Sequence, residues 1–117
     1  MIRRTIPGSL VLAVACGLLV FACSTSCSSA SSSARASSIE SLTADASSGQ
    51  SLYASNCASC HGSNGASGSA NKNVASVAKN QPTTAIDQIL GGGDGMASFS
   101  SLSDQEIADI VGYLKTL

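Results

Sequence analysis

The pentapeptide Cys57-Ala58-Ser59-Cys60-His61 constrains the fold more than any other stretch of this 117-residue chain. Two cysteines three positions apart on a helical turn project to the same side, so both thiols can form thioethers with the two vinyl groups of one porphyrin. The adjacent imidazole can then ligate iron from the same face. The spacing therefore predicts one covalently attached c-type haem per chain, held by Cys57, Cys60 and His61.

Two other interpretations of a C-x-x-C sequence fit this chain less well. A thioredoxin-like dithiol requires a βαβ context, which the sequence lacks. A zinc site requires further ligands, yet His61 is the only histidine and there is no second C-x-x-C. The haem interpretation is therefore favoured.

The N-terminus is typical of a secretory signal peptide. Arg3 and Arg4 precede an apolar run over residues 10–22, and we expect residues 1–22 to be removed on export. The run is shorter than the ~20 residues that a membrane span needs, so an uncleaved anchor is the less favoured alternative. Twin-arginine export is also disfavoured, because c-type haem is attached after the unfolded chain is exported. We expect a periplasmic location or one on the outer face of a membrane.

The bond before Cys23 fits two kinds of processing. Val20 and Ala22 are small enough for signal peptidase cleavage between Ala22 and Cys23. Val20-Phe21-Ala22-Cys23 also resembles the lipobox of bacterial lipoproteins, although Phe21 replaces the usual small residue. We therefore predict that Cys23 is lipidated, with a soluble secreted form as the alternative. Without a lipid, Cys23 could pair with Cys27 in an oxidising compartment.

Residues 23–46 consist mostly of serine and alanine and contain little to bury. Such a composition predicts a disordered tether between the anchor and the folded domain. The segment carries one arginine and no aromatic residue, which argues against nucleic-acid binding.

The folded haem domain is predicted to span residues 47–117. Ser47 and Gln50 form a capping-box pattern that starts a helix leading into the haem motif. The glycine-rich residues 62–68 lack the lysine and hydroxyl of a phosphate-binding loop, so we expect a turn beside the haem. A weak helical signal covers residues 74–80, and a stronger one starts at Pro82 and stops at Gly91.

The chain ends in an amphipathic pattern. Ser103 and Glu106 form a second capping box, which predicts the start of the last helix. An apolar stripe at helical spacing then predicts the face that this helix buries: Ile107, Ile110, Val111, Leu114 and Leu117.

Met96 is the candidate for a second iron ligand. It follows the glycine-rich residues 91–95, and the only other methionine is the initiator. Its distance from His61 in the sequence allows the chain to return across the opposite haem face. A six-coordinate electron-transfer haem takes a thioether there. We therefore predict that His61 and Met96 are the two axial ligands.

Residues 47–117 resemble the class I c-type cytochromes, which are small electron carriers with one haem. Gly49 and Tyr53 match a glycine and an aromatic residue that precede the family's haem motif. Residues 95–99, Gly-Met-Ala-Ser-Phe, are similar to its G-M-P-x-F segment. The family's C-terminal pattern is matched at Leu102, Ser103, Glu106, Ile107, Ile110, Tyr113 and Leu114.

The resemblance implies an all-α small cytochrome c fold with three to four short helices around one haem. It also implies that the first and last helices cross near Gly49, with Tyr53, Ile110 and Tyr113 packed around the crossing. The chain departs from the family pattern in two places. Ala97 replaces a proline, and no proline follows the haem motif before residue 82, so the carbonyl partner of His61 is not identified.

The sequence thus predicts a one-electron carrier that is not an enzyme. We expect a monomer with redox proteins as partners and a membrane reached through a lipid. One alternative is a haem subunit of a larger respiratory or photosynthetic complex. Another is a haem sensor or peroxidase, if Met96 leaves an open iron position.

Overall fold

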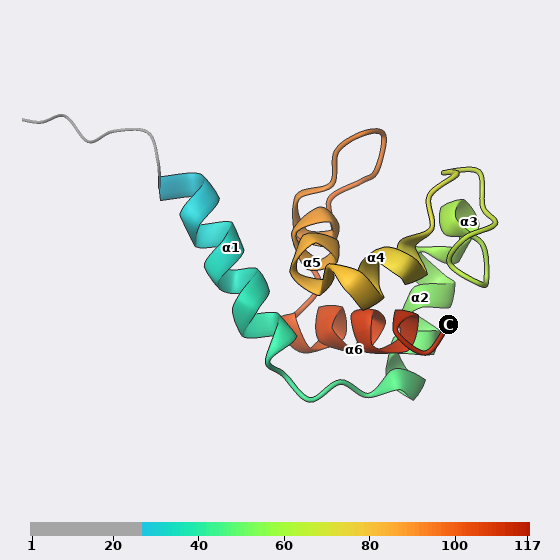
Figure 1. The fold of residues 1–117 in the computed structure, drawn as a ribbon, viewed down its shortest axis with the longest axis horizontal. Helices are drawn as coiled ribbons and strands as arrows, with labels where there is room; N and C mark the ends of the chain where they lie inside the picture. Colours follow the sequence, from blue (N-terminus) through green and yellow to red (C-terminus); the bar gives the residue numbers. More distant parts are fainter. Residues whose placement is uncertain (1–26) are drawn as a thin grey trace, which may run out of the picture.

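The computed structural model describes residues 27–117, so the predicted signal peptide and the lipidation site Cys23 lie outside the described residues. The described chain folds into helices without a β-strand, which confirms the predicted all-α class. Among these residues, no helix is long and apolar enough to cross a membrane. The helices are α1 (Cys27–Glu40), α2 (Ala46–Asn56), α3 (Ala58–His61), α4 (Val74–Asn80), α5 (Pro82–Gly91) and α6 (Asp104–Leu114) (Figure 1).

Helix α6 is the base on which the other helices pack. It runs beneath α4 and α5, while α2 crosses one of its ends and α1 lies near the other (Figure 1). Its start is fixed by the predicted capping box: the Ser103 amide donates to the Glu106 carboxylate at 2.8 Å, and the Glu106 amide donates to the Ser103 hydroxyl at 3.3 Å. The hydrogen bonds from Ser103 also lower the pKa of Glu106.

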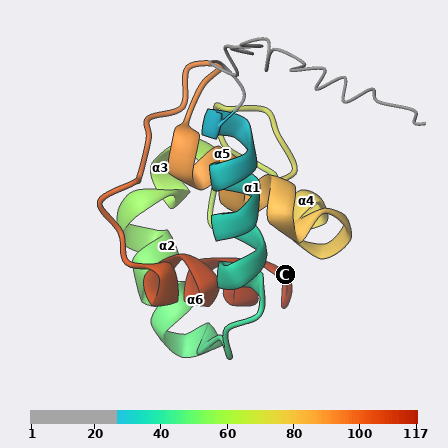
Figure 2. The ribbon, with the colours of Figure 1, turned by 90° about the vertical axis from the view of Figure 1, so that its left-hand side faces the viewer.

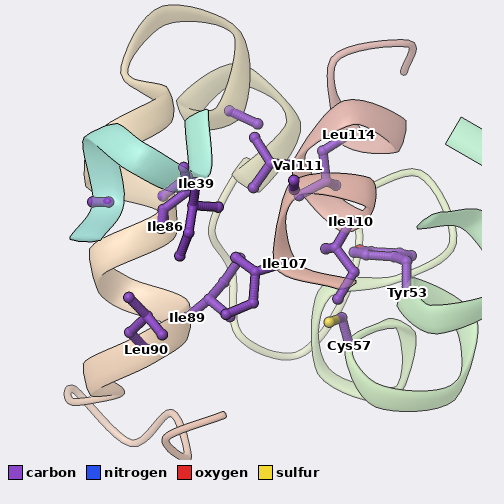
Figure 3. Close-up of a cluster of buried hydrophobic side chains, with 14 residues drawn as sticks. Ile39, Tyr53, Cys57, Ile86, Ile89, Leu90, Ile107, Ile110, Val111 and Leu114 are labelled. Carbon is purple, nitrogen blue, oxygen red and sulfur yellow. The ribbon is translucent and has the colours of Figure 1, made fainter. Parts of the chain in front are cut away.

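The predicted apolar stripe of α6 is buried over four of its five positions. Leu117 was predicted to belong to the stripe, but it lies beyond the end of the helix and its side chain is 41% exposed. The buried members join side chains of α1, α2 and α5 in one continuous core (Figure 3). These members are Ile107, Ile110, Val111 and Leu114.

The start of α2 differs from its prediction. The N-cap is Asp45 rather than Ser47, because the Asp45 carboxylate accepts hydrogen bonds from the amides of Ser47 and Ser48 at 2.9 and 3.2 Å. These bonds lower the pKa of Asp45. A carboxylate two residues earlier therefore takes the role that the sequence pattern assigned to a serine hydroxyl.

Helix α1 corrects the prediction of a disordered tether over residues 23–46. Residues 27–40 form a helix that packs against α5 and α6 (Figure 2). Ala36 and Ile39, three positions apart on one face, are fully buried, and Arg35 forms an ion pair with Asp104 at 2.7 Å. Composition misses this helix because two apolar side chains are enough to dock it once α5 and α6 offer a surface.

Candidate haem attachment site

The haem motif is held at the junction of α2 and α3. The Cys57 amide donates to the Tyr53 carbonyl at 2.8 Å, and the His61 amide donates to the Cys57 carbonyl at 2.9 Å. Cys57, Cys60 and His61 therefore share one helical turn, as the sequence predicts. Both cysteines are free, Cys57 buried and Cys60 exposed.

Burial distinguishes Cys57 from a redox-active thiol. Desolvation, with a smaller contribution from Cys60, raises the pKa of the Cys57 thiol to about 11. Reactive dithiols instead have lowered pKa values, because the thiolate is the reacting form. The structure thus gives no support to the thioredoxin-like alternative. The described residues also contain no cluster of three or more His, Cys, Asp and Glu side chains that could hold a metal ion.

His61 lies buried at the end of α3. Its side chain is 9% exposed, and its Nδ1 atom has no hydrogen-bond partner among the described residues. Burial lowers the pKa of the imidazole, which favours the neutral form that binds iron. The neutral ring directly after the two cysteines therefore fits an iron ligand, while a hydrogen-bond acceptor for its Nδ1 atom is not found among the described residues.

The loop after the motif folds back onto it. The Tyr53 hydroxyl donates to the Gly62 carbonyl at 2.7 Å, and the Ala70 amide donates to the Cys60 carbonyl at 2.9 Å. The sequence placed Tyr53 at the helix crossing but missed this hydrogen bond, because an aromatic residue four positions before the motif indicates packing and not the partner of its hydroxyl. Tyr53 thus ties α2 to the residue that follows His61.

Met96 lies on a loop that is fastened to the end of α5. Helix α5 ends at the predicted Gly91, and Gly92 follows with φ +67°. Gly93 and Met96 exchange two backbone hydrogen bonds of 2.9 Å each. The Phe99 amide also donates to the Ile89 carbonyl at 2.8 Å. This bonding fixes the backbone of the loop above α5 (Figure 1).

The side chain of Met96 packs on the same core that contains Cys57. It is partly buried against the apolar cluster, to which α5 contributes Ile89 and Leu90 and α6 contributes Ile107 (Figure 3). A porphyrin needs apolar walls of this kind, and the thioether that the sequence proposed as a ligand lies at their edge. The bond from Met96 to iron stays a prediction.

Two cysteines and a histidine in C-x-x-C-H order on one turn of a helical domain are typical of the class of c-type cytochrome domains. The family model for cytochrome c oxidase, cbb3-type, subunit III matches residues 44–114, and the chain belongs to this family. No curated protein and no solved structure matches the chain. Membership confirms the predicted cytochrome resemblance and implies haem-based electron transfer. Helix α1 lies outside the matched residues.

Proposed function

We propose that this protein is a one-electron carrier whose haem iron is ligated by His61 and Met96. The observation that carries the proposal is the buried His61 ring, which follows two cysteines on the same turn and whose burial favours the neutral imidazole. When bound, a c-type haem supplies reversible one-electron chemistry.

The residues of the chain have separate tasks in this proposal. Cys57 and Cys60 would attach the porphyrin, and His61 would offer a neutral ring nitrogen to the iron. The loop at residues 92–99 presents the Met96 thioether, and its hydrogen bonds to α5 limit how far the thioether can move. Thioether ligation raises the reduction potential of a haem. If His61 and Met96 both ligated the iron, no position would be open for a substrate, so we expect electron transfer alone and assign no enzymatic activity.

The proposed location is outside the cytoplasmic membrane. The signal-like N-terminus and the lipobox-like residues 20–23 support export and lipidation at Cys23. The haem domain would then act as a monomer beside the membrane and exchange electrons with redox proteins.

A second candidate function is a haem subunit of a larger complex. The observation in its favour is the family description, which names an oxidase subunit. Native electrophoresis of gently solubilised membranes with haem staining separates the two: a carrier migrates alone, whereas a subunit migrates with its complex.

Absorption spectra of the purified ferric and ferrous protein test the ligation. We expect low-spin c-type bands and, in the ferric form, a weak charge-transfer band from sulfur to iron. A high-spin spectrum together with ready binding of carbon monoxide would contradict the Met96 ligand and favour the sensor or peroxidase alternative.

A further inference from the structure

The N-terminal arm, residues 27–45, is attached to the haem domain in two different ways. Its last part, residues 43–45, is held on α6 by polar contacts. The Asp45 amide donates to the buried Asp109 carboxylate at 2.8 Å, and the Gln105 side chain donates to the Thr43 carbonyl at 2.9 Å. Ala44 packs so closely on Gly112 that a Cβ at that glycine would collide with it. These contacts fix the strap at residues 43–45.

Helix α1, the other part of the arm, is held by a small apolar contact and an exposed ion pair. Within residues 32–40 only Ala36 and Ile39 are buried. The ion pair between Arg35 and Asp104 joins side chains that are 41% and 48% exposed, so water and salt weaken it. A serine-rich helix of 14 residues is not stable by itself in water. Helix α1 therefore loses its helical structure when it leaves α5 and α6.

The docked helix also decides where the N-terminus leaves the domain. Ser32 and Arg35 line a groove together with Leu90 and Gly91 at the end of α5 and with Ser100 after the Met96 loop. The N-terminal half of α1 thus lies on the side of the domain that carries the Met96 loop (Figure 1). Three residues, 24–26, separate Cys23 from α1, and they span at most about 10 Å.

We propose that α1 is a releasable spacer: docked, it holds the haem domain close to its membrane anchor, and released, it unfolds and lengthens the reach of the domain. The strap at residues 43–45 stays in place, so release frees residues 27–42, which can extend to roughly 55 Å. The change in reach rests on the proposed lipid at Cys23, whereas the docking equilibrium does not. The docked state suits partners in the membrane, and the released state suits partners farther from it.

Trypsin measures the docking directly, because Arg35 is its only cleavage site between Arg4 and Lys72. In the haem-loaded full chain, cleavage after Arg35 requires release, since the following Ala36 is fully buried. Ile39→Asp removes the buried anchor, and we expect it to speed this cleavage about tenfold or more. Ser38→Asp is the matched control: it adds the same charge at an exposed neighbour and leaves the rate unchanged.

Two further variants complete the test. Ile39→Ala, which adds no charge, gives a smaller acceleration and replaces Ile39→Asp if that variant loses its haem. Asp104→Asn breaks the ion pair, so cleavage becomes up to about fivefold faster and loses the acceleration that added salt causes in the wild type.

Three results would each overturn the proposal: wild-type cleavage as fast as that of the Ile39 variants, Ile39 variants as slow as the wild type, or Ser38→Asp as fast as Ile39→Asp. The same rate ratios are expected in a soluble Cys23→Ser form. Failure of lipidation would therefore remove the change in reach without affecting the docking result.

Discussion

Gly49 of α2 lies directly against the backbone carbonyl of Asp109 in α6, so closely that a Cβ on the glycine would collide with the carbonyl oxygen. The two helices cross at this point, and the rings of Tyr53 and Tyr113 pack beside it with centroids 5.6 Å apart. Because α2 leads directly into the haem motif, the contact also decides where Cys57 lies relative to α6. The crossing that the cytochrome resemblance implied is thereby confirmed.

The close contact predicts a specific cost for the smallest possible substitution. Gly49→Ala should lower the free energy of unfolding by about 2 kcal/mol or more, because neither backbone can move away without disturbing the core. Guanidinium unfolding of the haem-loaded protein measures this cost. Gly91→Ala is the control: nothing lies within 4 Å of its added Cβ, and we expect it to be neutral or stabilising by about 0.5 kcal/mol. Equal effects of the two substitutions would contradict the crossing geometry.

The hydroxyl of Tyr53 gives a second prediction. Tyr53→Phe removes its hydrogen bond to Gly62 and should cost about 1–2 kcal/mol at neutral pH. Tyr113→Phe should cost less than about 0.5 kcal/mol, because no side-chain hydrogen bond of its hydroxyl is seen in the described structure.

Tyr53 also predicts a pH dependence. Burial raises its pKa in the folded state, so the folded protein favours the neutral phenol. The contribution of the neutral phenol to the free energy of unfolding is complete below the unfolded-state pKa of about 10. It is lost as the pH rises through the higher pKa of the folded state. The stability gap between the wild type and Tyr53→Phe should therefore narrow above pH 10. A gap that stays constant up to pH 12 would count against the buried phenol.

The loop that carries Met96 depends on Gly92. This glycine has φ +67°, and an added Cβ would lie 2.7 Å from the Met96 carbonyl oxygen. Gly92→Ala should therefore displace the loop and weaken the ferric charge-transfer band of the thioether. Gly95 is the control: it has a similar backbone conformation, φ +84°, but nothing lies within 4 Å of an added Cβ. Gly95→Ala should therefore lower the free energy of unfolding by only about 1–2 kcal/mol and keep the charge-transfer band. If the charge-transfer band survives equally in both variants, the position of the Met96 thioether does not depend on Gly92.

Met96→His tests the proposed second iron ligand through the reduction potential of the haem. Imidazole should keep the iron six-coordinate and low-spin but favour the ferric state, so the potential should fall by more than about 59 mV, equivalent to about 1.4 kcal/mol. Potentiometric titration of the visible spectrum measures the change. An unchanged potential in a fully haem-loaded variant would show that Met96 is not the ligand.

Cys23→Ser tests the anchor. The variant should move from the membrane fraction to the soluble exported fraction with unchanged haem content, because the predicted haem attachment residues lie within residues 44–114, far from Cys23 in the sequence. Cys27→Ser should stay with the membrane, since Cys27 is not at the predicted cleavage site. If both variants stayed equally in the membrane fraction, the alternative of an uncleaved N-terminal anchor would be favoured.

The sequence by itself determined the parts of the protein that depend on neighbours along the chain. The C-x-x-C-H spacing fixes two thiols and an imidazole on one turn, and the Ser103 capping box and the stripe of α6 need only helical periodicity. Local bonding and side-chain chemistry settle such features. They were sufficient to predict the last helix and its N-cap, and they make Cys57, Cys60 and His61 the predicted haem-binding residues.

Only the tertiary structure decided the contacts between residues far apart in the chain. The composition of residues 23–46 predicts disorder, yet α1 forms because α5 and α6 cover Ile39 and Asp104 pairs with Arg35. A local sequence pattern likewise does not predict the hydrogen bond from the Tyr53 hydroxyl to Gly62 or the one from the Asp45 amide to Asp109. The physical reason is that burial and long-range hydrogen bonds stabilise a segment only when the folded chain has brought its distant partners together.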